Sequence, residues 1–230
     1  MVKEDLISRS PVRVFMQSIR GGLKPGEIGI IAAPAGLGKT SVLVQIALDK
    51  LLQDQKVIHV SFTKHSDYVL AWYEEIFEES VRKKNLEQLD EVKNEIVKNR
   101  VLMKFTQEGV TGEQILNSLG ALIRDGGFNA QWIIIDGFDF AKTDPEQIAK
   151  VKKAAAELGL SFWYSCNAER YDKQGIPAAL AGYADVMDVI VVLDPRPDHI
   201  KLAVVKDRET LNPGQSALRL DPKTLLMLEE

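Results

Sequence analysis

Residues 33–41, which read APAGLGKTS, combine residue types that can hold a phosphate group. Glycine lets the backbone approach an anion closely, and a helix that begins here aims its N–H groups and the positive end of its dipole at the same point. The spacing Ala-x4-Gly-Lys-Thr predicts a nucleotide-binding loop, in which a lysine reaches the terminal phosphates and a hydroxyl binds Mg²⁺. The predicted binding residues are Ala33, Pro34, Ala35, Gly36, Leu37, Gly38, Lys39, Thr40 and Ser41, with Lys39 as the phosphate cation and Thr40 as the metal ligand.

The first position of this loop carries alanine where glycine is more usual. A methyl group at Ala33 is tolerable if the backbone φ stays negative, so the substitution does not exclude phosphate binding. The alternative is a glycine-rich turn that arose by chance. The apolar run before the loop and the helical stretch after it favour a binding loop.

Asp136 ends the most hydrophobic run of the chain, QWIIID at 131–136. A carboxylate at the end of a buried strand is costly unless it has a partner. We therefore expect Asp136 to lie near the loop and to orient Mg²⁺ through water, as the second metal residue beside Thr40. The alternative is an aspartate that only caps a turn.

The elements that must position these residues alternate between strand and helix. We expect strands at 28–33, 56–62, 101–105, 131–136, 160–166, 188–194 and 199–206. One helix is expected at 39–52. A second should begin at the capping box of Thr111 and Gln114, and a third at Pro145. A charged helical pair exposed to solvent is expected within 67–99, with Trp72, Ile76 and Phe77 on one face. This order predicts a single α/β domain over 1–230, with a mostly parallel sheet flanked by helices on both faces.

The composition limits the class of protein. The chain has 230 residues, a net charge of −4 and a single cysteine, Cys166. Its pI of about 5.6 disfavours a nucleic-acid coat protein, which usually carries a basic excess. A lone cysteine cannot form an internal disulfide, and no apolar run is long enough for a signal core or a membrane span. We expect a cytoplasmic protein without a membrane partner.

The segment at 19–48, IRGGLKPGEIGIIAAPAGLGKTSVLVQIAL, resembles the opening of RecA-superfamily ATPases of the KaiC, RadA and DnaB type. Three later segments, KVIHVSF, WIIIDGFDF and HIKLAVVKDRE, are similar to landmarks of that family in the same order. The resemblance runs from about residue 18 to 228. It implies a RecA-like core, ATP and Mg²⁺ as ligands, and rings or filaments, possibly a hexamer, with ATP at the subunit interface.

The same resemblance implies roles for a late Lys-x-Arg pair, Lys206 and Arg208. Together with Lys39 and Asp136 they would form the catalytic set, with the pair reaching a neighbouring subunit's γ-phosphate. A positive charge there offsets charge on the transferring phosphoryl group. The alternative is a surface salt-bridge pair beside Asp207 and Glu209.

One part of the family pattern is missing. Members usually place a glutamate after the second core strand to orient the attacking water, whereas this chain has Thr63 and Lys64 there, followed by His65. Threonine is not a strong base at neutral pH, so we expect binding with slow hydrolysis or none. At the end of the strand at 160–166, Cys166 or Asn167 is a candidate phosphate sensor, or Asn167 is only a turn residue.

These observations favour an ATP–Mg²⁺-binding protein that is a slow or weak ATPase and acts as a nucleotide-dependent switch or assembly module. A non-catalytic nucleotide-binding regulatory or scaffold protein with a protein partner is the first alternative. A DNA-dependent ATPase of the helicase or recombinase type is the second, disfavoured by the acidic balance. A small-molecule kinase is less favoured still, because the sequence shows no arginine-rich lid.

Overall fold

The structure is a computed structural model and describes residues 2–8, 10–62, 66–82, 89–106, 111–213 and 218–229. In these residues ten strands form one sheet, in the order β10-β9-β7-β6-β1-β5-β4-β2-β3, with β8 paired to β7. The strands are β1 (Ile28–Ala33), β2 (Val57–Ser61), β3 (Arg100–Lys104), β4 (Trp132–Asp136), β5 (Ser161–Asn167), β6 (Val189–Pro195), β7 (Ile200–Asp207), β8 (Thr210–Leu211), β9 (Leu218–Leu220) and β10 (Met227–Glu229).

The sheet is mostly parallel, as expected. Strands β3, β2, β4, β5, β1 and β6 run parallel to one another, and β7, β8, β9 and β10 extend the sheet by antiparallel pairs. The parallel strands are apolar on both faces, because helices cover both sides of them. Because these strands run in the same direction, their carboxyl ends meet at one edge of the sheet, where the loop after β1 lies.

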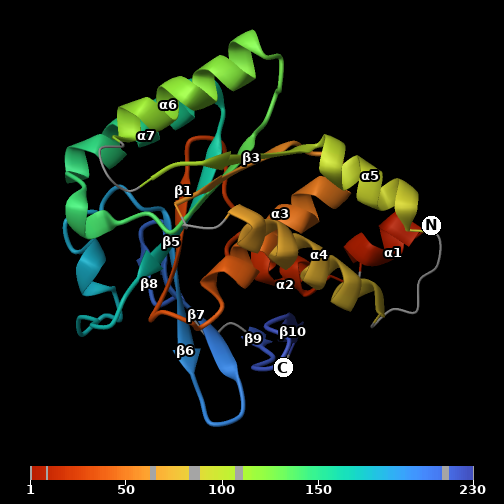
Figure 1. Ribbon diagram of the computed structural model, residues 1–230. Coiled ribbons are helices and arrows are strands. Elements are labelled where there is room, and N and C mark those ends of the chain that lie inside the picture. Colours follow the sequence, from red (N-terminus) through yellow and green to blue (C-terminus); the bar gives the residue numbers. More distant parts are fainter. Residues whose placement is uncertain are drawn as a thin grey trace.

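The helices form two layers (Figure 1). One face of the sheet carries α3 and α4 with α1, α2 and α5, and the other face carries α6 and α7. The helices are α1 (Val2–Ser8), α2 (Pro11–Ser18), α3 (Lys39–Leu52), α4 (Ser66–Arg82), α5 (Asp90–Lys98), α6 (Gly112–Gly120) and α7 (Pro145–Leu158), with a π-helical turn at Ala121–Asp125 and 3-10 turns at Phe140–Lys142 and Ala178–Leu180.

Helix α3 lies in the middle of the first layer. It is buried from Ser41 to Leu52, as its nearly uniform apolar sequence predicts. The predicted caps are also confirmed: Thr111 and Gln114 form a capping box, and the Asp144 side chain accepts a hydrogen bond from the first turn of α7. These local signals fix where α6 and α7 start.

The charged helical pair differs from the expectation of a mainly solvated unit. Most of the charged residues of α4 and α5 are exposed, but Tyr73, Phe77 and Ile96 are buried and pack in the same core as α3. Apolar residues at helical spacing require such a buried face, so the pair belongs to the layer that covers the sheet.

Two helices, three short strands and the end of one helix were not predicted. Helices α1 and α2 pack on the α3 layer, and the short strands β8, β9 and β10 continue the sheet beyond β7. The helix that starts at Gly112 ends in a π-helical turn, which carries Leu122 and Ile123 of the expected apolar stripe. In the described residues, no helix is both long enough and apolar enough to cross a lipid bilayer.

Candidate functional site

The loop between β1 and α3 has the backbone that its sequence predicts. Gly36 and Gly38 have φ values of 82° and 90°, in the left-handed region that favours glycine. Ala33 is the last residue of β1, so its methyl group is accommodated in an ordinary strand. Gly38 caps α3 without a side chain, which leaves the first N–H groups of the helix for an anion to satisfy.

Lys39 begins α3 and folds back over this loop. Its Nζ donates hydrogen bonds to the carbonyl oxygens of Ala33 and Pro34, at 3.0 and 2.8 Å. Burial lowers the pKa of this lysine, and the negative charge of Asp136 opposes that shift. Two carbonyls are weak partners for an ammonium group, so a phosphate in the loop would be a stronger one.

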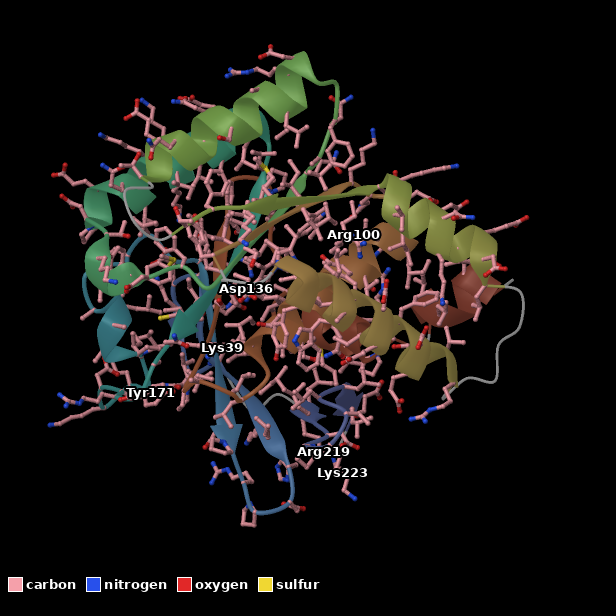
Figure 2. The ribbon with its side chains drawn as sticks, viewed as in Figure 1. Lys39, Arg100, Asp136, Tyr171, Arg219 and Lys223 are labelled. Atoms are coloured by element: carbon pink, nitrogen blue, oxygen red, sulfur yellow. The ribbon has the colours of Figure 1, made fainter. Side chains whose placement is uncertain are left out.

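Thr40 and Asp136, 96 residues apart in sequence, meet at the edge of the sheet. The Thr40 hydroxyl donates to Asp136 Oδ2 at 2.8 Å, and the Ser165 hydroxyl on β5 donates to Oδ1 at 2.7 Å. Figure 2 shows Asp136 and Lys39 near each other at this edge. Hydroxyl and carboxylate oxygens are the ligand types that Mg²⁺ prefers, so the pair fits the metal that the sequence implies.

The carboxyl-terminal segment is fastened to the first turns of α3. The Ser41 hydroxyl and the Gln45 amide both donate to the carbonyl oxygen of Leu225, at 2.7 and 2.9 Å. The Gln45 carbonyl accepts from the backbone N–H of Met227 at 2.7 Å. Sequence analysis missed this contact, although a glutamine inside a uniformly apolar helix signals a buried polar partner.

A cavity of about 240 Å³ lies beside this contact, between α4 and the turn before β10. The Trp72 side chain forms one wall, and its Nε1 is buried with no hydrogen-bond partner in the described residues. The ring of Tyr68 stands edge-on to Trp72, with ring centroids 6.0 Å apart. The remaining lining residues are Glu75, Ile76, Glu79, Lys223 and Thr224.

A second cavity of about 190 Å³ lies at the tips of β4 and β5 and is lined in part by Asp139, Cys166 and Asn167. Burial raises the pKa of the Cys166 thiol to about 12, so the thiol is protonated at neutral pH. Asn167 is exposed and lies next to Ala33 in the β1–β5 register. Its place beside the loop is compatible with the predicted sensor role, which stays a prediction.

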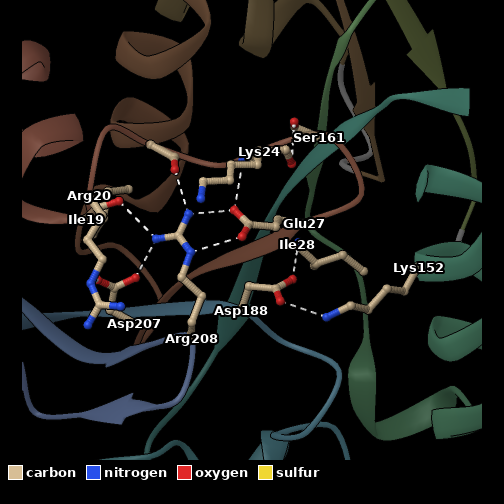
Figure 3. A network of polar contacts seen from close by, with 11 residues as sticks. Ile19, Arg20, Lys24, Glu27, Ile28, Lys152, Ser161, Asp188, Asp207 and Arg208 are labelled. Carbon is tan, nitrogen blue, oxygen red and sulfur yellow. Dashed lines mark hydrogen bonds and ion pairs between the residues drawn. The ribbon is translucent and has the colours of Figure 1, made fainter.

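Lys206 lies near the carboxyl end of β7, and Arg208 directly follows that strand. Both side chains donate hydrogen bonds within the chain. Lys206 Nζ donates to the carbonyl oxygens of Ala184 and Met187. All five N–H groups of Arg208 are used: two reach the Glu27 carboxylate, one the Asp207 carboxylate, and two the carbonyls of Ile19 and Gly22 (Figure 3).

The Arg208 contacts shift the pKa values of the groups involved. The hydrogen bond to Glu27 raises the pKa of Arg208. Burial acts to raise the pKa of Glu27, but the bonds from Arg208 and from the Lys24 backbone lower it below its ordinary value of 4.5. Arg208 therefore holds the segment before β1 against the end of β7. A role in a neighbouring subunit's site stays a prediction, and it requires these contacts to break.

The segment that lacks the glutamate cannot be placed. Thr63, Lys64 and His65 lie outside the described residues. The predicted loop, Thr40 and Asp136 are brought together, whereas the Trp72 cavity and the Leu225 contact had not been foreseen. Comparison of the sequence with models of known protein families finds no match, and comparison with curated proteins also finds none.

The Arg208 network predicts a large effect on stability. Arg208→Met leaves the Glu27 carboxylate without its main partner and the Asp207 carboxylate with Arg20 as its remaining ion pair, and we expect the free energy of unfolding to fall by about 3 kcal/mol at pH 7. Arg20→Met is the matched control, because Arg20 pairs with Asp207 at 3.0 Å from a side chain that is 57% exposed. We expect it to cost less than about 1 kcal/mol in urea unfolding.

The same pair predicts a pH dependence. The pKa of Glu27 in the folded chain lies below 4.5. The contribution of its ionised carboxylate to stability is therefore complete above pH 4.5 and is lost as the pH falls through the folded pKa. The stability gap between wild type and Arg208→Met should therefore narrow in acid. Two results would show that Arg208 does not hold the segment before β1 against the end of β7. One is an equal loss of unfolding free energy in the two variants at pH 7, and the other is a stability gap between wild type and Arg208→Met that does not change with pH.

Proposed function

We propose that this chain binds ATP with Mg²⁺ at residues 33–41, as a RecA-like nucleotide-dependent switch or assembly module. The observation that carries the proposal is the 2.8 Å hydrogen bond from the Thr40 hydroxyl to Asp136. Thr40 directly follows Lys39 within residues 33–41, and Asp136 ends β4. Two residues from distant parts of the chain meet where the phosphate-loop pattern requires a metal site. The resemblance to RecA-superfamily ATPases adds the expectation that the nucleotide is ATP.

Each group has a distinct task in this proposal. The N–H groups of the loop and of the first turn of α3 hold the phosphates, and Lys39 moves from two carbonyls to the terminal phosphates. Thr40 binds the metal directly, and Asp136 orients it through water. Mg²⁺ supplies charge neutralisation for the triphosphate. Ser165 holds the Asp136 carboxylate in place from β5.

In this proposal the nucleoside occupies the cavity between α4 and the turn before β10. Thr224 lines that cavity, and the next residue, Leu225, is bonded to Ser41 in the first turn of α3. A base there would stack on an aromatic ring. Around it lie an indole N–H that has no partner among the described residues, two carboxylates and the Lys223 ammonium group. Such a mixture of one aromatic wall and a few polar groups is typical of small-molecule sites.

The proposal predicts that binding depends on Lys39. We expect Lys39→Ala to weaken ATP–Mg²⁺ binding by roughly 10- to 100-fold, because a charge-assisted hydrogen bond to phosphate is lost. Lys153→Ala on α7 is the control, since Lys153 is exposed on the opposite face of the sheet. Isothermal titration calorimetry measures both. Equal affinity for wild type and Lys39→Ala would exclude the loop as the site.

The cavity assignment predicts a selective effect of Trp72. Base stacking on an aromatic side chain contributes about 1–3 kcal/mol, so Trp72→Ala should weaken ATP binding by roughly 5- to 160-fold. The same variant should bind inorganic tripolyphosphate as wild type does, and Trp72→Phe should keep most of the ATP affinity. A parallel loss of ATP and tripolyphosphate affinity would contradict the assignment of this cavity to the base.

Hydrolysis is expected to be slow. A positioned general base contributes roughly 10²–10⁴-fold, and residues 63–65 provide no carboxylate. The two oxygens of Asp136 already accept hydrogen bonds from Thr40 and Ser165. We expect turnover far below about 1 s⁻¹, raised by Thr63→Glu. A brisk rate in wild type, abolished by Lys39→Ala, would mean that another residue supplies the base.

The absence of that carboxylate also favours the first alternative, a non-catalytic regulatory or scaffold module in which ATP stabilises an assembly. A ligand that binds only the assembled form stabilises it by mass action. The proposal includes self-association promoted by nucleotide, up to a hexamer. That part rests only on the resemblance to RecA-superfamily ATPases. The contacts of Lys206 and Arg208 within their own chain do not support it directly.

A further inference from the structure

A cavity of about 340 Å³ lies between α3, α4, α5 and the first residue of β3, apart from the phosphate loop. Its apolar walls include Leu48, Phe77 and Ile96, and its volume is in the range of small-molecule sites. In the view of Figure 2, Arg100 at the start of β3 lies on the far side of Asp136 from Lys39. The nucleotide proposed above does not require this cavity.

Arg100 is the charged group that matters in this cavity. Its guanidinium carbon lies 4.2 Å from the centroid of the buried Tyr73 ring, and the side chain is half-buried. In the part of the chain that the structure describes, the guanidinium makes no hydrogen bond or ion pair. Arg208, by contrast, donates hydrogen bonds from all five of its N–H groups. Arg100 therefore has five N–H donors that an added ligand could use.

The other charges at the cavity lie on its exposed rim. Lys93 and Glu78 form an ion pair at 3.4 Å and offset each other, and both side chains are about half exposed or more. Glu74 is also exposed, so water screens its charge. Glu74 acts on Arg100 only at longer range, without an ion pair. The inner part of the cavity therefore presents one positive charge among apolar and aromatic side chains.

We propose that this cavity binds a small carboxylic acid with an apolar tail. The carboxylate receives a two-pronged hydrogen bond from the N–H edge of the Arg100 guanidinium, whose planar fork matches carboxylate geometry, while one face of the guanidinium stays over the Tyr73 ring. The tail packs against Phe77, Ile96 and Leu48. Binding supplies hydrogen-bond acceptors to a guanidinium that is half-buried beside apolar side chains, which favours an acid over an alcohol of the same length.

The test uses octanoate as the acid and octan-1-ol as its uncharged analogue, with binding to the full chain measured by calorimetry. Wild type should bind octanoate roughly 10- to 100-fold more tightly than octan-1-ol, the range expected for a hydrogen bond to a charged group. Arg100→Leu should abolish that preference, and Lys93→Ala on the rim should keep it. Amide NMR shifts on octanoate binding should be confined to α4, α5, the part of α3 around Leu48 and the start of β3.

Three results would overturn the proposal: no octanoate binding by wild type, equal affinity for acid and alcohol, or an acid preference that survives Arg100→Leu. If Arg100→Leu does not fold, Arg100→Gln and the wild-type comparison of acid with alcohol decide the question. Lys39→Ala should leave octanoate affinity unchanged. Loss of octanoate binding in Lys39→Ala would place the acid at the phosphate loop and would also contradict the proposal.

Discussion

The carboxylate of Asp136 is 3% exposed, and its need for hydrogen-bond partners organises the edge of the sheet. Thr40 and Ser165 meet that need from α3 and β5, so the start of α3 is held over the end of β4 with β5 between β4 and β1. The loop before α3 must then span a short gap with two glycines in the left-handed region. A buried charge thus fixes the geometry that a phosphate and a metal would use.

Two further polar contacts keep this arrangement in place from outside the parallel strands. Gln45 joins α3 to the carboxyl-terminal segment, and Arg208 joins the end of β7 to the segment before β1. Both link residues more than 170 positions apart, so each closes a long loop. The cavity at Trp72 exists because the first of these contacts places the turn before β10 against α4.

Much of the central fold could be predicted, because its signals are local. Apolar runs predicted the seven longer strands, the capping box predicted the start of α6, and the phosphate-loop spacing predicted that Asp136 lies beside Thr40. Strands of two or three residues, such as β8, carry too little periodicity to recognise. The partners of Arg208 and the setting of Trp72 depend on contacts between distant segments, which no local pattern encodes. Helix α2 is different, since the helical spacing of Val12, Phe15 and Met16 is a local signal for it.

The central claim is that residues 33–41 hold a triphosphate with its metal. A crystal structure of the chain grown with Mg²⁺ and a non-hydrolysable ATP analogue tests it most directly. The account predicts phosphate density in the loop, a metal within ligand distance of the Thr40 hydroxyl, and Lys39 Nζ moved from the carbonyls of Ala33 and Pro34 to the terminal phosphate. An empty loop at saturating analogue, with Lys39 still bonded to those two carbonyls, would contradict it.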